Sequence, residues 1–272
     1  MQEQLAKVEG AVVYWTARLT DLTKLKAAWS KLGYGSMVPA KRSGLQLMRD
    51  ALMMEFPSNG SPRLVRKMKG GNALAVVIEN KEDTDNRYTT VQKAKLLKDG
   101  SIETDPPTVL VQGRYDSMAT TMPGSAVGNL LIRAVRHLSG VTLRNTGGIY
   151  WVPPEGLDRF RLLAEAVEES GGSTVYLMAT QFDDKTAEAV KDGLEAEVRA
   201  TASAIIEQLA SGELGQKAID GRRTRANKLL DKTRKYEALL GTVLSEVRAT
   251  IEQIEVAAVA AELASQAGEN VA

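Results

Sequence analysis

The chain begins with a short apolar run and continues with two segments in which apolar residues recur every three or four positions. Residues 11–19 join β-branched and aromatic side chains in series, which predicts a β-strand. Residues 22–32 carry leucine and tryptophan at helical spacing behind Asp21, a residue type that caps helices. Ser43 stands in the same place before a second helical pattern, at residues 44–56. This part of the chain therefore predicts one strand followed by two helices.

The next part indicates an antiparallel sheet. Three runs favour strands, at residues 63–69, 73–81 and 87–97. The turn residues that follow the first and third runs, at 70–72 and 99–100, include the Gly-Gly and Asp-Gly pairs that are typical of hairpins. Short turns connect antiparallel neighbours, so we expect one antiparallel sheet here.

Residues 103–125 contain three prolines and show no clear period. We expect a long loop there, with one short strand at residues 108–112. The regular pattern then returns, and it predicts a helix at 125–138, a strand–turn–strand hairpin at 141–153, a helix at 154–170 and a strand at 173–182.

The composition changes after Phe182. From Thr186 onward the chain has no proline and a single aromatic residue. We expect one helix to about residue 210 and a longer one from about 214 into the 260s. The longer helix carries a heptad seam, which predicts an antiparallel helical hairpin, extended into a coiled coil. The seam residues that we expect to mediate oligomerisation are Leu229, Tyr236, Leu240, Val243, Val247 and Ile254.

These patterns together predict an α+β fold. An α+β domain at residues 1–182, with a mainly antiparallel sheet, would precede a helical hairpin at residues 183–272.

Composition excludes several kinds of chemistry. The chain has 272 residues, no cysteine and one histidine, so thiolate catalysis, disulfides and sites with two histidines are ruled out. It contains no P-loop, dinucleotide-binding or G-x-S-x-G motif. No apolar run is long enough for a membrane helix, and the first ten residues are polar. We therefore expect a cytoplasmic protein without membrane contact, cofactor, metal or catalytic residue.

Charge is unevenly distributed along the chain. Residues 1–150 hold 21 Lys and Arg against 13 Asp and Glu, and residues 151–272 hold 14 against 21. The balances are +8 and −7, which sum to the net charge of +1. Such an asymmetry is typical of a chain that binds nucleic acid at one part, and also of one whose two halves associate.

A basic cluster on the predicted sheet makes nucleic acid the first candidate partner. On a strand, Arg63, Lys67 and Lys69 would share one face and Arg66 the other. Lysines that protect an edge strand from aggregation are the alternative. Few aromatic residues lie nearby, so the sequence does not indicate a stacking platform. The residues that we expect to bind nucleic acid, or an acidic partner, are Lys41, Arg42, Arg63, Arg66, Lys67, Lys69, Lys93, Lys95 and Arg144.

An acidic group offers a competing function. Glu79, Asp83 and Asp85 could hold a divalent ion in a metal-dependent nuclease or phosphoryl-transfer enzyme. That fold also needs an acidic residue on a preceding strand, and residues 56–78 contain none. A solvated loop after a strand is therefore the simpler interpretation.

The predicted long helix contains a second basic cluster that begins at Arg222. The preceding helix is acidic, so pairing across the hairpin explains the cluster, and a phosphate-binding helix is the alternative.

The hairpin at 141–153 carries a resemblance. Its G-G-x-Y-x-V-P stretch, made of Gly147, Gly148, Tyr150, Val152 and Pro153 and followed by C-terminal helices, resembles an uncharacterised family of hypothetical proteins from phage and prokaryotic genomes. The resemblance implies no active-site residue, and it favours a role in a phage or another mobile element.

We therefore expect a non-catalytic binding or assembly protein. A basic face in its N-terminal part would bind nucleic acid or an acidic partner, and the helical hairpin would form a homo-oligomer or hold a protein partner. The metal-dependent enzyme and a purely structural, self-assembling protein remain as alternatives.

Overall fold

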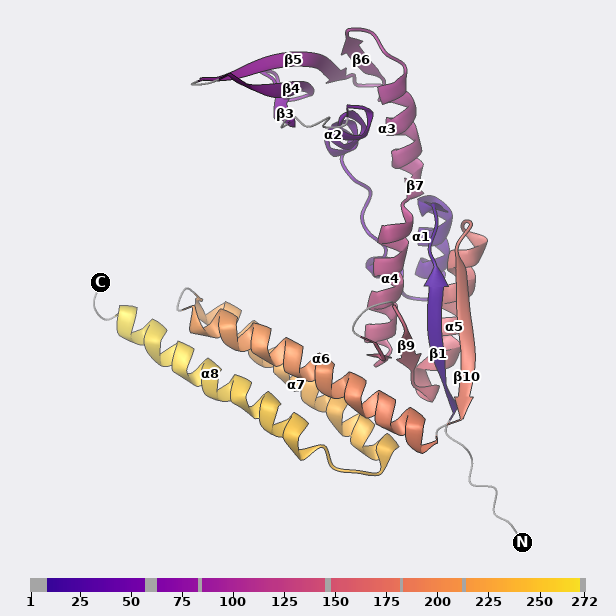
Figure 1. Cartoon of the computed structure of the whole chain (residues 1–272), viewed down its shortest axis with the longest axis vertical. Helices are drawn as coiled ribbons and strands as arrows, with labels where there is room; N and C mark the ends of the chain where they lie inside the picture. The colour runs from indigo at the N-terminus through magenta and orange to yellow at the C-terminus, as the bar shows by residue number, and fades with distance from the viewer. Residues whose placement is uncertain are drawn as a thin grey trace. The chain divides into compact units, whose positions relative to one another are not determined.

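The computed structural model describes residues 9–56, 63–82, 85–144, 148–181, 183–211 and 214–269. The chain divides into two compact units, and Figure 1 shows the elements of both. Unit 1 comprises Met1–Thr16, Leu131–Glu165 and Thr174–Ala272, and unit 2 comprises Ala17–Leu130 and Ala166–Ser173. Helices α4 (Gly124–His137) and α5 (Pro154–Glu169) contribute residues to both units.

Unit 1 contains a four-stranded antiparallel sheet and three long helices. The strands, in the order β10-β1-β9-β8, are β10 (Thr174–Gln181), β1 (Glu9–Thr16), β9 (Tyr150–Val152) and β8 (Val141–Thr142). The helices are α6 (Asp184–Ala210), α7 (Gln216–Leu240) and α8 (Ser245–Glu269). Strand β1 pairs with β10 along all eight of its residues. The predicted hairpin is confirmed by the pairing of Val141 with Trp151, although its turn at 145–147 lies outside the described residues.

One hydrophobic core joins this sheet to the three helices. Trp151 is fully buried in it, and the ring of Tyr236 from α7 lies 6.1 Å away, centroid to centroid. The Trp151 indole also donates a hydrogen bond to Thr180 Oγ1, at 3.3 Å. Gly10 leaves the space for this ring, since a Cβ at that position would lie within 2.5 Å of indole atoms. The core therefore crosses residue 182, where the sequence placed a domain boundary.

The C-terminal helices differ from the prediction. The chain turns at residues 241–244, so the expected second helix is divided into α7 and α8. Gly241 adopts a left-handed conformation with φ 64°, which only glycine reaches without strain and which ends α7. Each of the three helices contacts the other two, as Figure 1 shows.

This turn also changes the meaning of the heptad seam. Leu229 and Tyr236 on α7, together with Val247 and Ile254 on α8, are buried in the core of a single chain. The seam folds back on itself because α8 runs back along α7, so these four residues are not free to face a second copy. Leu240 is half-buried at the end of α7, and Val243 is exposed in the turn.

Unit 2 holds a second four-stranded antiparallel sheet, in the order β3-β4-β5-β6. Its strands are β3 (Arg63–Lys67), β4 (Ala73–Glu82), β5 (Asp85–Leu96) and β6 (Ile102–Asp105). The other elements are β2 (Thr20–Asp21), α1 (Leu22–Lys31), the 3-10 helix η1 (Gly35–Met37), α2 (Gly44–Glu55), α3 (Leu110–Thr120) and β7 (Thr121–Met122), which pairs with β2.

Helices α2 and α3 cover one face of this sheet. Met48 and Leu52 of α2 pack with Leu74 and Val76 of β4 in a fully or nearly fully buried cluster. The start of α2 follows the sequence prediction, because the Ser43 hydroxyl accepts a hydrogen bond from the backbone of the third helical residue, whose own side chain bonds back. The opposite face of the sheet, which we call the outer face, carries the residues discussed below.

The prediction of a long loop at 103–125 with a strand at 108–112 is wrong, because this segment forms most of β6 and all of α3. Val111, Tyr115 and Met118 follow one another at helical spacing and pack on the cluster beneath the sheet. The Gln112 side chain accepts a hydrogen bond from the Ile102 backbone, at 2.6 Å, which ties α3 to β6. Apolar residues recur only weakly at helical spacing in α3, so its helical state depends on contacts with the rest of unit 2.

The fold class is confirmed: the protein is an α+β protein with antiparallel sheets and C-terminal helices.

Candidate functional site

The outer face of the β3–β6 sheet brings together three of the predicted basic residues. Arg66 lies opposite Ala75, which lies opposite Lys93, so the two bases belong to one row across the sheet. Lys95 is two residues further along β5 and therefore projects from the same face. All three side chains are exposed.

A β-bulge adds an aromatic ring to this face. Val76 pairs with Gln92 but the next residue, Val77, pairs with Thr90, so Val91 is an extra residue in β5. Side chains alternate along a strand, and an extra residue reverses the alternation beyond it. Tyr88 therefore projects from the same face as Lys93, whereas regular pairing would turn it toward α2.

Tyr88 and Arg66 contact each other on the outer face. The guanidinium carbon of Arg66 lies 4.9 Å from the centre of the Tyr88 ring, a cation–π distance. The Tyr88 hydroxyl donates to Glu79 Oε1, at 3.2 Å, and 47% of the tyrosine remains exposed. An accessible ring beside a guanidinium is an arrangement on which a nucleobase can stack.

Acidic side chains also lie on this face, on β4 and on β6. Lys93 Nζ lies 3.4 Å from Asp105 Oδ2, and Lys95 stands opposite Glu103, so both of these carboxylates are on the edge strand β6. The Lys93–Asp105 ion pair is exposed and contributes little to stability. The Glu79 carboxylate on β4 accepts the hydrogen bond of the Tyr88 hydroxyl, so bases and acids alternate across the face.

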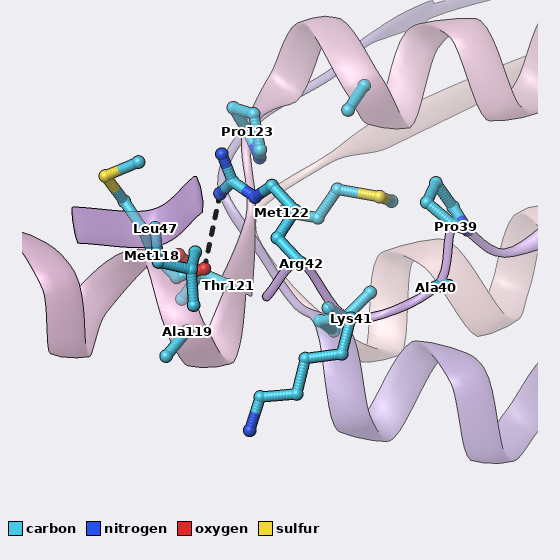
Figure 2. Close-up of a pocket in the computed structure, with 12 residues that line it drawn as sticks. Pro39, Ala40, Lys41, Arg42, Leu47, Met118, Ala119, Thr121, Met122 and Pro123 are labelled. Atoms are coloured by element: carbon cyan, nitrogen blue, oxygen red, sulfur yellow. Dashed lines mark hydrogen bonds between the residues drawn. The ribbon is translucent and has the colours of Figure 1, made fainter. Parts of the chain in front are cut away.

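The structure separates the other predicted nucleic-acid residues from this group. Lys67 belongs to the covered face, at the free edge of β3, and Lys69 lies in the turn after it. Lys41 and Arg42 lie in the loop before α2 (Figure 2). Arg144 is exposed in unit 1. The nine residues therefore do not form one face; the Arg63 side chain lies outside the described residues.

The acidic alternative receives no geometric support. Asp83 and the Asp85 side chain are outside the described residues, and Glu79 accepts the tyrosine hydrogen bond. Among the residues that the structure describes, no group of three or more acidic or histidine side chains could hold a metal ion.

The basic cluster of α7 is largely used inside unit 1. Lys232 Nζ lies 2.8 Å from Glu197 of α6 and donates to the Gly140 carbonyl, which confirms the pairing predicted between these helices. Burial lowers the pKa of Lys232, and the Glu197 carboxylate opposes this shift. Arg223 pairs instead with Glu255 and Glu262 of α8, and its pKa is raised by hydrogen bonds to these two carboxylates.

Within the described part of the chain, no helix combines the length and apolar character that a membrane crossing requires.

Fold and site together define an α+β protein with three C-terminal helices and a charged outer sheet face. The chain belongs to DUF6744, a family of unknown function whose model matches residues 59–269. The expected relation to an uncharacterised family is thus confirmed, and the match includes the G-G-x-Y-x-V-P hairpin. No curated protein and no solved structure matches the chain.

Proposed function

We propose that this protein is a non-catalytic binding protein that holds single-stranded nucleic acid on the outer face of its β3–β6 sheet. The observation that carries the proposal is the Arg66–Tyr88 contact beside Lys93 and Lys95 on one exposed face. Tyr88 would stack on a base, and the three cations would contact phosphates.

The charge of unit 2 agrees with this proposal. The unit holds 17 Lys and Arg against 13 Asp and Glu, whereas unit 1 holds 18 against 21. The balance of +4 is smaller than the +8 of residues 1–150, mainly because Arg133, Arg136 and Arg144 belong to unit 1 and Glu168 and Glu169 belong to unit 2. A modest positive charge favours binding that is strong at low salt and weak at high salt.

Fluorescence anisotropy with a labelled 20-nucleotide strand, over a series of salt concentrations, tests the proposal. Three phosphate contacts predict a slope of about −2 for the logarithm of affinity against the logarithm of salt. Lys93→Glu should weaken binding at least about tenfold at low salt, because it places a negative charge in the middle of the face.

Lys67→Glu is the matched control, because it makes the same change of charge in the same sheet, but on the covered face of the edge strand β3. Tyr88→Ala separates stacking from charge, since it should weaken binding without changing the salt slope. Equal losses for Lys67→Glu and Lys93→Glu would show that binding follows the edge of the sheet. Absence of salt-sensitive binding at low salt would refute the proposal.

The remaining expectations belong to the same proposal: a cytoplasmic protein of a phage or another mobile element, acting as a homo-oligomer.

The proposed surface for self-association is formed by Val256, Val259 and Leu263, which are exposed on α8 at spacings of three and four. Leu263→Glu should lower the mass measured by sedimentation equilibrium. Gln253→Glu, beside this stripe, should leave the mass unchanged, and a wild-type monomer would contradict self-association.

A further inference from the structure

Unit 2 contains an apolar cavity, open to solvent on one side, that the nucleic-acid proposal does not use. Its volume is about 210 Å³. The walls come from α1, α2, the end of α3, β7 and the start of α4, and they include Leu22, Leu47, Met118, Met122, Pro123 and Ala126. Figure 2 shows the side chains that line it. The volume equals that of about seven water molecules, enough for a short alkyl chain.

The lining suits an apolar group better than water. Water in a cavity needs two to four polar partners, and most of these walls are aliphatic or thioether side chains. Met118 and Met122 are flexible, so this part of the wall can adjust to the shape of a ligand.

Two basic residues, Lys41 and Arg42, are part of the lining. Arg42 Nη1 contacts Asp50 Oδ2 at 2.6 Å, and Nη2 donates to the Met118 carbonyl at 3.4 Å, the bond dashed in Figure 2. A guanidinium has five N–H donors, so these two contacts leave donors for an anion. Among the described residues, no carboxylate lies within ion-pair distance of the Lys41 ammonium.

We propose that this cavity binds a small amphipathic carboxylate of the medium-chain fatty acid type. The alkyl chain would fill the space between Met118, Met122 and Leu47, and the carboxylate would meet Arg42 at the margin. Charge complementarity selects an anionic head group, because the only charged side chains in the lining are basic.

Isothermal titration calorimetry of the whole protein with octanoate tests the inference. Octanoate should bind saturably to one site. Octanol should bind at least about fivefold more weakly because it lacks the charge, and acetate should not bind because it lacks the chain. Inorganic phosphate is titrated as a comparison. If phosphate bound as strongly as octanoate, the site would be a plain anion site and the inference would be overturned.

Variants locate the site. Ala119→Phe should abolish octanoate binding by filling the cavity, and Ala40→Trp, in an exposed part of the lining, does the same with less risk to folding. Arg42→Gln should weaken octanoate at least about fivefold and leave octanol unchanged. Lys24→Gln on α1, which is exposed and outside the lining, is the control.

Circular dichroism confirms that each variant is folded. Octanoate that binds folded Ala119→Phe and Ala40→Trp as tightly as the wild type, or that does not bind the wild type, would overturn the inference. Nucleic-acid binding is measured separately, and neither result depends on the other.

Discussion

Glu237 shows how one residue decides the course of the C-terminal helices. Its side chain is buried at the end of α7, where the carboxylate accepts hydrogen bonds at 2.8 Å from the Leu244 backbone and from Arg248 Nε. The bond to Arg248 is the main cause that lowers the pKa of Glu237 below its usual value of 4.5. The ionised carboxylate thus holds together the turn that separates α7 from α8.

This contact predicts a pH-dependent stability. A carboxyl group whose pKa is lowered by folding adds stability above its unfolded pKa, and loses it as the pH falls through the folded pKa. Glu237→Gln should therefore melt at a lower temperature than the wild type at pH 7. The difference should shrink below about pH 4.5. Thermal unfolding followed by circular dichroism from pH 7 to pH 3 measures it, and a constant difference would contradict the argument.

The candidate site was only partly predictable at the residue scale. Arg66, Lys93 and Lys95 could be named because a cluster of bases on strands is visible in the sequence. Tyr88 could not be assigned to their face, because the bulge at Val91 reverses the alternation of side chains. No turn residue or proline marks this bulge in the sequence.

At the scale of elements, the packing of α8 is specific for one of its faces. Ile254 is fully buried against α6 and α7, whereas Val256, two residues later, is 72% exposed. Residues that are two positions apart on a helix are rotated by about 200° around its axis, so Ile254 and Val256 occupy nearly opposite faces.

Ile254→Ala should lower the free energy of unfolding by about 2–5 kcal/mol, because it leaves a cavity in the core. Gln253→Ala, at an exposed position of the same helix, should change it by less than about 0.5 kcal/mol. Urea denaturation measures both. A change of mass without loss of stability in Ile254→Ala would show that the seam joins two chains after all.

Helix α3 and the heptad seam show two structural features that the spacing of apolar residues alone does not predict. Helix α3 lacks a strong apolar period, and its helical state depends on contacts with α2 and β6. The heptad seam was a correct sign of helix packing, but periodicity does not distinguish a partner helix of the same chain from one of another chain. The turn at Gly241 makes that distinction.

At the scale of the whole molecule, the helices and the β1–β10 sheet share one core. Trp151 connects them, since it lies on β9, contacts Tyr236 of α7 and donates to Thr180 of β10. A separate helical domain that begins after residue 182 would have its own core and would not depend on this ring.

Trp151→Ala should therefore destabilise α6 and α7 as well as the sheet, by about 3–5 kcal/mol. Hydrogen exchange measured by mass spectrometry should show faster exchange in the peptides of both helices. Trp151→Phe, which keeps a ring but loses the hydrogen bond to Thr180, should have a smaller effect. Unchanged exchange in the helices of Trp151→Ala would support the boundary at residue 182.

The sequence by itself determined most helices, the hairpins, the antiparallel character of the sheets and the absence of thiol chemistry. These features are local, since they depend on spacing, capping residues and turn residues within a few positions. Tertiary structure alone decided the face that Tyr88 occupies, the burial of the heptad seam, the helical state of α3 and the apolar cavity. Each of these depends on which surfaces meet, and contacts between residues far apart in the chain determine that.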